Sequence, residues 1–173
     1  AQGGTYDVYG QRYDANGQKV GSEFRVNSVT TNDQGYDAAG TGIPNLDVIG
    51  LSGGGFVVTF AGEAGSGVTG SQDSSNWGVY ARRYDAAGTA QGTESVVNTF
   101  RTNSQLVPQG ASLTDGGYVS AWGSDGQGGS GYGVYAQRYN SAGVAQGGEF
   151  RVNVITSGNQ GSRSGTDTYE ENL

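Results

Sequence analysis

The feature that most constrains this chain is a hexapeptide that occurs three times. It reads VYGQRY, VYARRY and VYAQRY, at residues 8–13, 79–84 and 134–139. A short turn rich in Asp, Asn and Gly follows each copy, and a segment of the form E-x-x-V-N then follows each turn, at residues 23–27, 94–98 and 149–153. Self-similarity at a period of several tens of residues is typical of repeat architectures. We therefore expect the recurring residues to form the scaffold and any specific site to lie where the repeats differ.

The hexapeptides start 71 and then 55 residues apart, so the basic unit has about 55 residues and one copy carries insertions. Alignment of the copies places these insertions around residues 35–45 and 62–76. The whole length suits one domain with a sizeable core. We expect a single β-repeat domain over residues 1–156 and a polar C-terminal tail. It divides into a half unit, two full units and the tail, at residues 5–27, 46–98, 106–153 and 157–173.

Composition favours an all-β fold. The chain has 34 glycines but only 2 prolines and no triplet glycine period, which excludes collagen. Its 11 Tyr, 5 Phe and 2 Trp supply the buried area that disordered chains lack. Each full unit contains four runs of β-branched and aromatic residues bounded by Gly, Asn or Asp, as expected of strands joined by tight turns.

Four-stranded antiparallel repeats of this length are typical of β-propeller blades. Two and a half units fall short of the roughly 4–8 blades of a closed propeller. We therefore expect either a partial propeller that is a fragment of a longer repeat array, or a ring or open stack completed by other chains.

The half unit at residues 5–27 has only two strands, and a lone hairpin is marginal in water. Tyr6, Tyr9, Tyr13 and Phe24 would leave apolar surface unburied there. We expect other chains to complete this sheet, which predicts a homo-oligomer or polymer formed through strand edges.

Charge and composition exclude several partners and chemistries. The net charge of −7 disfavours nucleic acid, and no apolar run approaches the roughly 20 residues that span a membrane. The chain has no Cys and no His, which removes thiol nucleophiles, the commonest metal ligand and the usual general base. It starts at Ala1 without Met, as a processed secreted product would.

The repeat unit has the pattern G-x-Y-G-V-Y-x-Q-R-Y, then a turn and G-x-E-F-x-V-N, and then D-G-G-[FY]-V-x-x-W. It resembles a repeat of very large secreted bacterial proteins. Those are giant adhesins and haemolysin-type, calcium-associated exoproteins of Gram-negative bacteria. Residues 113–122, 131–139 and 148–153 and Gly143 carry the match. The resemblance implies an extracellular or cell-surface location, a propeller-like fold and no catalysis.

The resemblance also makes Ca²⁺ the candidate cofactor. Residues 128–133 approach the calcium nonapeptide G-G-x-G-x-D, but Gly133 stands where the Asp belongs. Asp125 is the only carboxylate of that loop, and Asp73 is the only Asp of the matching loop. Because Ca²⁺ prefers about six to eight oxygen ligands, a plain glycine-rich connection is the favoured interpretation.

Three aromatic residues in or beside connections are candidates for stacking on sugars: Tyr36, Trp77 and Tyr132. Residues 71–77 also approximate the Asp-box of glycan-handling propellers, without its central Gly. The simpler interpretation is that these rings cap hydrophobic edges.

Recurring charges form a third set. We expect cross-strand ion pairs that stabilise the scaffold, between Arg12 and Glu23, Arg83 and Glu94, and Arg138 and Glu149. No two carboxylates are spaced as a glycosidase pair, and the sequence has no catalytic motif. The chain is therefore predicted not to be an enzyme.

Two functions remain. The first is an extracellular structural, self-assembling or adhesin-type protein of a bacterial surface. The alternative is a lectin-like propeller module, with calcium assisting carbohydrate binding.

Overall fold

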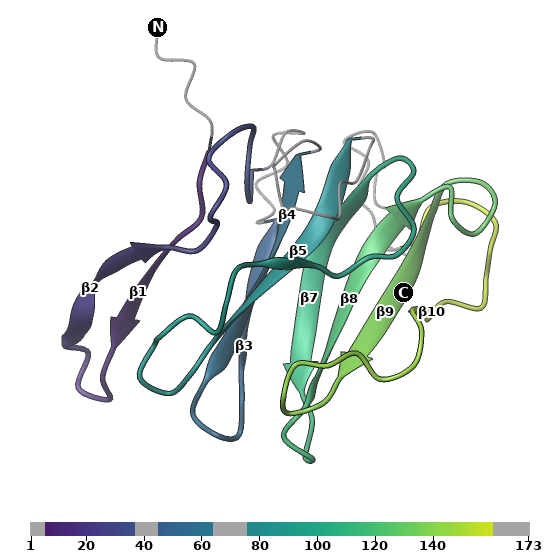
Figure 1. Cartoon of the computed structure of the whole chain (residues 1–173). Helices are drawn as coiled ribbons and strands as arrows, with labels where there is room; N and C mark the ends of the chain where they lie inside the picture. The colour runs from purple at the N-terminus through teal and green to yellow at the C-terminus, as the bar shows by residue number, and fades with distance from the viewer. Residues whose placement is uncertain (1–5, 37–44, 64–75, 161–173) are drawn as a thin grey trace, which may run out of the picture.

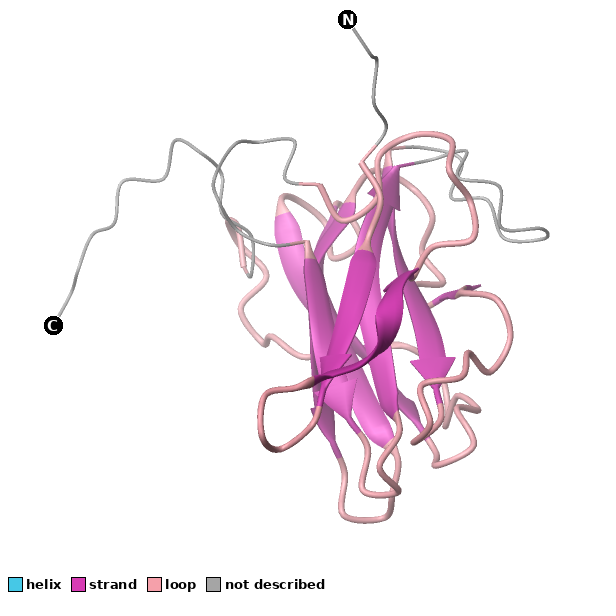
Figure 2. Ribbon diagram, turned by 90° about the vertical axis from the view of Figure 1, so that its left-hand side faces the viewer, coloured by secondary structure: helices cyan, strands magenta, loops and turns pink. Residues whose placement is uncertain are grey.

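A computed structural model describes residues 6–36, 45–63 and 76–160. These residues form ten strands and no helix (Figure 2). With no helix in these ranges, none there could cross a membrane. The strands are β1 (Tyr9–Tyr13), β2 (Lys19–Arg25), β3 (Leu46–Gly50), β4 (Phe56–Glu63), β5 (Trp77–Tyr84), β6 (Ser95–Val96), β7 (Gln105–Ser112), β8 (Tyr118–Asp125), β9 (Tyr132–Tyr139) and β10 (Phe150–Arg151).

The strands form three antiparallel sheets, one for each repeat unit, and lie side by side in chain order (Figure 1). Unit 1 (residues 6–27) is the two-stranded sheet β1-β2. Unit 2 (residues 34–98) has the order β3-β4-β5-β6, and unit 3 (residues 105–153) has the order β7-β8-β9-β10. Each hexapeptide strand pairs with the E-x-x-V-N strand that follows it. The all-β, four-stranded antiparallel repeat is thus confirmed, whereas the described residues form no closed ring.

The turn after each hexapeptide strand is built in the same way in all three units. Its first residue is Asp14, Asp85 or Asn140, and the glycine three residues later donates its backbone N–H to that residue's carbonyl. These glycines have φ between 76° and 83°, a conformation that a side chain would disfavour. The side-chain oxygen of Asp14 or Asn140 also accepts backbone N–H groups within its own turn.

The recurring asparagine ties the hexapeptide strand of each unit to the strand that follows it. The side-chain oxygens of Asn27, Asn98 and Asn153 accept the N–H groups of Val8, Val79 and Val134, each at 2.8 Å. This contact extends the ladder where the fourth strand diverges from the third. It also gives the asparagine of the E-x-x-V-N segment a scaffold role.

The units bury their apolar side chains against one another. One cluster joins Val57, Val79 and Val97 of unit 2 to four aromatic residues of unit 3, namely Tyr118, Trp122, Tyr135 and Tyr139. The other joins Val8 and Val26 of unit 1 to the opposite side of unit 2, through Val58, Phe60, Tyr80 and Tyr84. Successive residues of a strand face opposite sides, so unit 2 is covered on both faces. The core therefore lies between sheets.

The first insertion falls within a strand position, as the alignment predicts. Gln34 bridges to Gly62, and after the inserted segment Leu46 resumes pairing opposite Phe60. In unit 3 the same stretch is a bulge at Val107, whose φ is 53°. Residues 37–44 and 64–75 of the insertions lie outside the described residues.

Candidate functional site

A recurring arginine links each unit to the next. Arg12 donates to the carbonyls of Ala86, at 2.8 Å, and Ala87, which lie in the hairpin turn of unit 2. Arg83 donates in the same way to the carbonyl of Ser141 in the turn of unit 3. Each arginine is the last residue but one of its hexapeptide strand. They therefore bind backbone of the following unit rather than the glutamate of their own hairpin.

A recurring glutamate links each unit to the preceding one. Glu94 accepts the backbone N–H of Ser28 at 2.8 Å and its hydroxyl at 2.9 Å. Glu149 accepts the N–H and hydroxyl of Thr99 at 2.7 and 3.0 Å. Hydrogen bonds to a carboxylate are stronger than those between neutral groups.

These contacts correct the expected partners of the charged residues. Among the described residues, no ion pair joins Arg12 to Glu23, Arg83 to Glu94 or Arg138 to Glu149. The reason is that the arginine and the glutamate of one unit project from opposite faces of its sheet, the arginine towards the following unit and the glutamate towards the preceding one. The arginines and glutamates still belong to the scaffold, but they connect units.

The two ends of the stack leave this pattern incomplete. Glu23 lies in unit 1, which has no preceding unit among the described residues. It is exposed and has no partner within those ranges. Arg138 has no following turn there and pairs instead with Asp115, and both side chains are about half exposed. The backbone N–H of Gly117, together with Arg138, holds the pKa of Asp115 below its ordinary value.

Apolar side chains at the ends are likewise uncovered. Tyr80 is 2% exposed where unit 1 covers it, whereas Tyr9, at the same repeat position in unit 1, is 55% exposed. Val97 is 4% exposed under unit 3, whereas Val152, its equivalent in unit 3, is 52% exposed. We call Tyr9, Tyr13 and Glu23 the N-terminal face. Arg138, Phe150 and Val152 form the C-terminal face.

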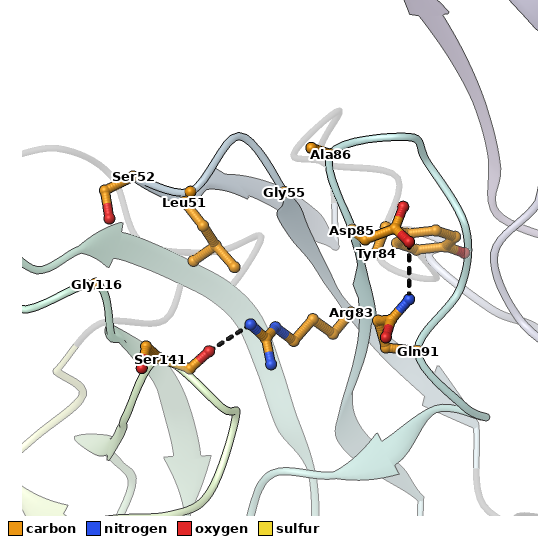
Figure 3. A pocket seen from close by; sticks show the side chains of 11 residues that line it. Leu51, Ser52, Gly55, Arg83, Tyr84, Asp85, Ala86, Gln91, Gly116 and Ser141 are labelled. Atoms are coloured by element: carbon orange, nitrogen blue, oxygen red, sulfur yellow. Dashed lines mark hydrogen bonds between the residues drawn. The ribbon is translucent and has the colours of Figure 1, made fainter.

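A groove of about 300 Å³ lies at the turn end of units 2 and 3 (Figure 3). Arg83 crosses it to reach Ser141, and Asp85 accepts a hydrogen bond from Gln91 at 3.1 Å. The ring of Tyr84 lines the groove but is only 3% exposed. The polar side chains of the groove are therefore bonded to the protein itself.

The residues predicted to bind calcium are not brought together in the described structure. Asp125 ends β8, opposite Tyr132, and its N–H donates to Ser104. Asp73 lies outside the described residues. Within the described ranges no three His, Cys, Asp or Glu side chains cluster as metal ligands would. Calcium binding stays a prediction.

The predicted sugar-stacking aromatics occupy scaffold positions. Tyr36 stacks on Tyr6, with ring centroids 4.0 Å apart. Trp77 and Tyr132 begin β5 and β9, and Tyr6 is their equivalent in unit 1. The small hollow beside Tyr132, of about 10 Å³, has room for little more than one water molecule. Sugar stacking by these rings remains a prediction.

One recurring residue escaped the sequence analysis. Gln34, Gln105 and Gln160 each follow the recurring asparagine by seven residues, a spacing visible in the sequence. The N–H groups of Gln34 and Gln160 donate to the carbonyls of Tyr6 and Tyr132. Unit 3 therefore continues past Asn153 in the way that unit 1 continues past Asn27.

The chain matches no protein-family model, no curated protein and no solved structure.

Proposed function

We propose that this chain is a non-catalytic, self-assembling β-repeat protein of a bacterial surface or the extracellular space. The observation that carries the proposal is the contrast between equivalent positions. Residues that are buried wherever a neighbouring unit is present are exposed at both ends of the stack. An apolar face of this kind, rimmed by charged residues, is typical of an association site.

Several features support the other parts of the proposal. The sequence resemblance to secreted adhesin-type repeats favours an extracellular location. Arg83 and Asp85 of the groove are bonded to the Ser141 carbonyl and to Gln91, which argues against an acid–base pair poised for catalysis. The negative net charge is compatible with solubility outside the cell.

Carbohydrate binding is the second candidate, and the groove is the observation in its favour. Its volume is at the lower end of the range for ligand pockets, and Arg83, Asp85 and Gln91 offer polar contacts. The buried ring of Tyr84 offers no open face for stacking, however, so self-assembly is the better supported function.

Light scattering coupled to size-exclusion chromatography tests the proposal. The purified chain is expected to increase in mass over several decades of protein concentration. Parallel runs with Ca²⁺ and with EDTA measure any calcium dependence, and a glycan array measures sugar binding. A chain that stays monomeric throughout and binds glycans would overturn self-assembly in favour of the lectin alternative.

A further inference from the structure

We propose that the two end faces bind each other, so that copies of this chain join head to tail. The C-terminal face of one copy would receive the N-terminal face of the next, in the arrangement that relates successive units within one chain. This inference rests on the proposed self-assembly and adds to it the partner, the polarity and the contacting residues.

The first argument is the position of Arg138. Arg12 and Arg83, its equivalents, donate to the backbone carbonyls of the following turn. In unit 1 the corresponding carbonyls belong to Ala15 and Asn16, in an exposed turn. Arg138 would have to leave Asp115, but an exposed ion pair contributes little stability. A second copy therefore offers Arg138 backbone carbonyls equivalent to those that Arg12 and Arg83 bind.

The second argument is the position of Glu23. Its equivalents Glu94 and Glu149 accept from the residue that follows the asparagine of the preceding unit. At the end of unit 3 that residue is Val154, which is exposed. Val154 supplies the backbone N–H but has no hydroxyl. The contact between copies would thus lack the hydroxyl hydrogen bond that both internal contacts have.

The apolar side chains of the two end faces also match each other. Inside the chain, Val97 lies in one cluster with Tyr135 and Tyr139. In a head-to-tail pair the equivalent residues are Val152 of one copy and Tyr9 and Tyr13 of the next. All of these side chains are about half exposed in the single chain. Their mutual burial would drive association.

Phe150 has a matching precedent in unit 1. Phe24, its equivalent, packs on the ring of Tyr84 with centroids 5.2 Å apart. Phe150 is about half exposed, and Tyr13 is the equivalent of Tyr84 in unit 1. The two end faces therefore complement each other in both their hydrogen-bonding and their apolar groups.

Such an interface uses different surfaces on its two sides. Heterologous contacts of this type generate rings when the rotation closes and filaments when it does not, and they do not generate a two-fold dimer. A chain with one face blocked should therefore still bind another chain through its intact face.

The test uses two full-length variants. Val152→Glu places a charge on the C-terminal face, and Tyr13→Glu places one on the N-terminal face, where burial would be costly. Each variant alone is expected to remain monomeric at concentrations where the parent chain assembles. Their mixture is expected to form a one-to-one heterodimer and nothing larger, because only one pair of faces is intact. Thr89→Glu, in the exposed hairpin turn of unit 2, which lies between units 1 and 3 and away from both end faces, is the control and should assemble like the parent chain.

Circular dichroism and thermal melting verify that each variant is folded. Phe150→Glu and Tyr9→Glu form a second pair with the same expectation, should either first variant unfold. If a singly blocked variant still assembles, or if the mixture yields no heterodimer, head-to-tail association is wrong while self-assembly stands. If the parent chain never assembles, the proposed function itself fails.

Discussion

The interface between units 2 and 3 and the two end faces present nearly the same side chains in opposite states. Tyr135 and Tyr139 are buried against unit 2, whereas Tyr9 and Tyr13, at the same repeat positions, face outward. Within the chain, burial at a repeat position therefore depends on the neighbouring unit more than on the unit's own sequence. A repeat that cannot cover its own faces depends on stacking for its stability.

The same comparison separates charged side chains that bind a neighbouring unit from charged side chains that do not. Glu94 is buried and bonded to unit 1, whereas Glu23 is exposed and free of partners in the described ranges. Arg83 is anchored on a carbonyl of unit 3, whereas Arg138 rests on an exposed carboxylate. The contacts of the recurring arginines and glutamates thus show on which side a unit has a neighbour.

The largest expected difference is between Tyr80 and Tyr9. Tyr80→Ala removes a buried ring that stacks on Phe60 at 5.7 Å, and should lower the free energy of unfolding by about 3 kcal/mol or more. Tyr9→Ala removes an exposed ring and should cost less than about 1 kcal/mol in the monomer. Urea denaturation at concentrations below assembly measures both values. Equal costs would mean that the two positions do not differ in burial.

The next difference concerns the recurring asparagine. Asn98 is buried, and Asn98→Ala would leave the buried N–H of Val79 without its acceptor, a loss of about 2 kcal/mol. Asn153 and Val134 are only half-buried, so water would replace the lost bond and Asn153→Ala should cost less than about 1 kcal/mol. The two denaturation midpoints decide the matter: a larger effect at Asn153 would contradict the comparison.

The smallest effect is a dependence on alkaline pH that belongs to the unit 2–unit 3 interface. Burial raises the pKa of Tyr118 from 10.0 to about 12, and burial also raises the pKa of Tyr139, which stacks on Tyr118 at 4.7 Å. The folded state keeps protons that the unfolded chain loses above pH 10.0. Their contribution to stability is complete below that pH and is lost as the pH rises towards about 12.

At about pH 11 the loss attributable to Tyr118 should be on the order of 1 kcal/mol. Tyr118→Phe should reduce the difference in unfolding free energy between neutral and alkaline pH by that amount. Denaturation of both proteins at the two pH values measures it. An unchanged difference in the variant would show that Tyr118 does not ionise with unfolding in this range.

The fold was largely accessible from the sequence because local signals and the repeat agree. The hexapeptide, the turn and the E-x-x-V-N segment each fix a strand or a turn, and comparison of the copies located the first insertion. The partners of Arg12 and Glu94 were not accessible, because the arginine and the glutamate of one hairpin lie on opposite faces of the sheet. The face that each side chain takes depends on the hairpin register, which the strand pattern alone does not fix.

The end faces were only partly predictable. Tyr9 and Tyr13 were expected to be uncovered, since unit 1 lacks two strands. Val152 was not singled out, because it holds the same position in the E-x-x-V-N segment as Val97. Only its place in the last unit distinguishes it. The spacing from Asn27 to Gln34, from Asn98 to Gln105 and from Asn153 to Gln160 was visible but not used.

The bridge between Gln34 and Gly62, followed by the pairing of Leu46 with Phe60, has an evolutionary consequence. The sheet register is the same before and after the added segment as it is around the bulge of unit 3. Extra sequence can therefore enter at this point without shifting any strand. A lineage could diversify the sequence inserted at this point in each unit while inheriting the stack unchanged, and an engineer could graft a foreign peptide at the same place.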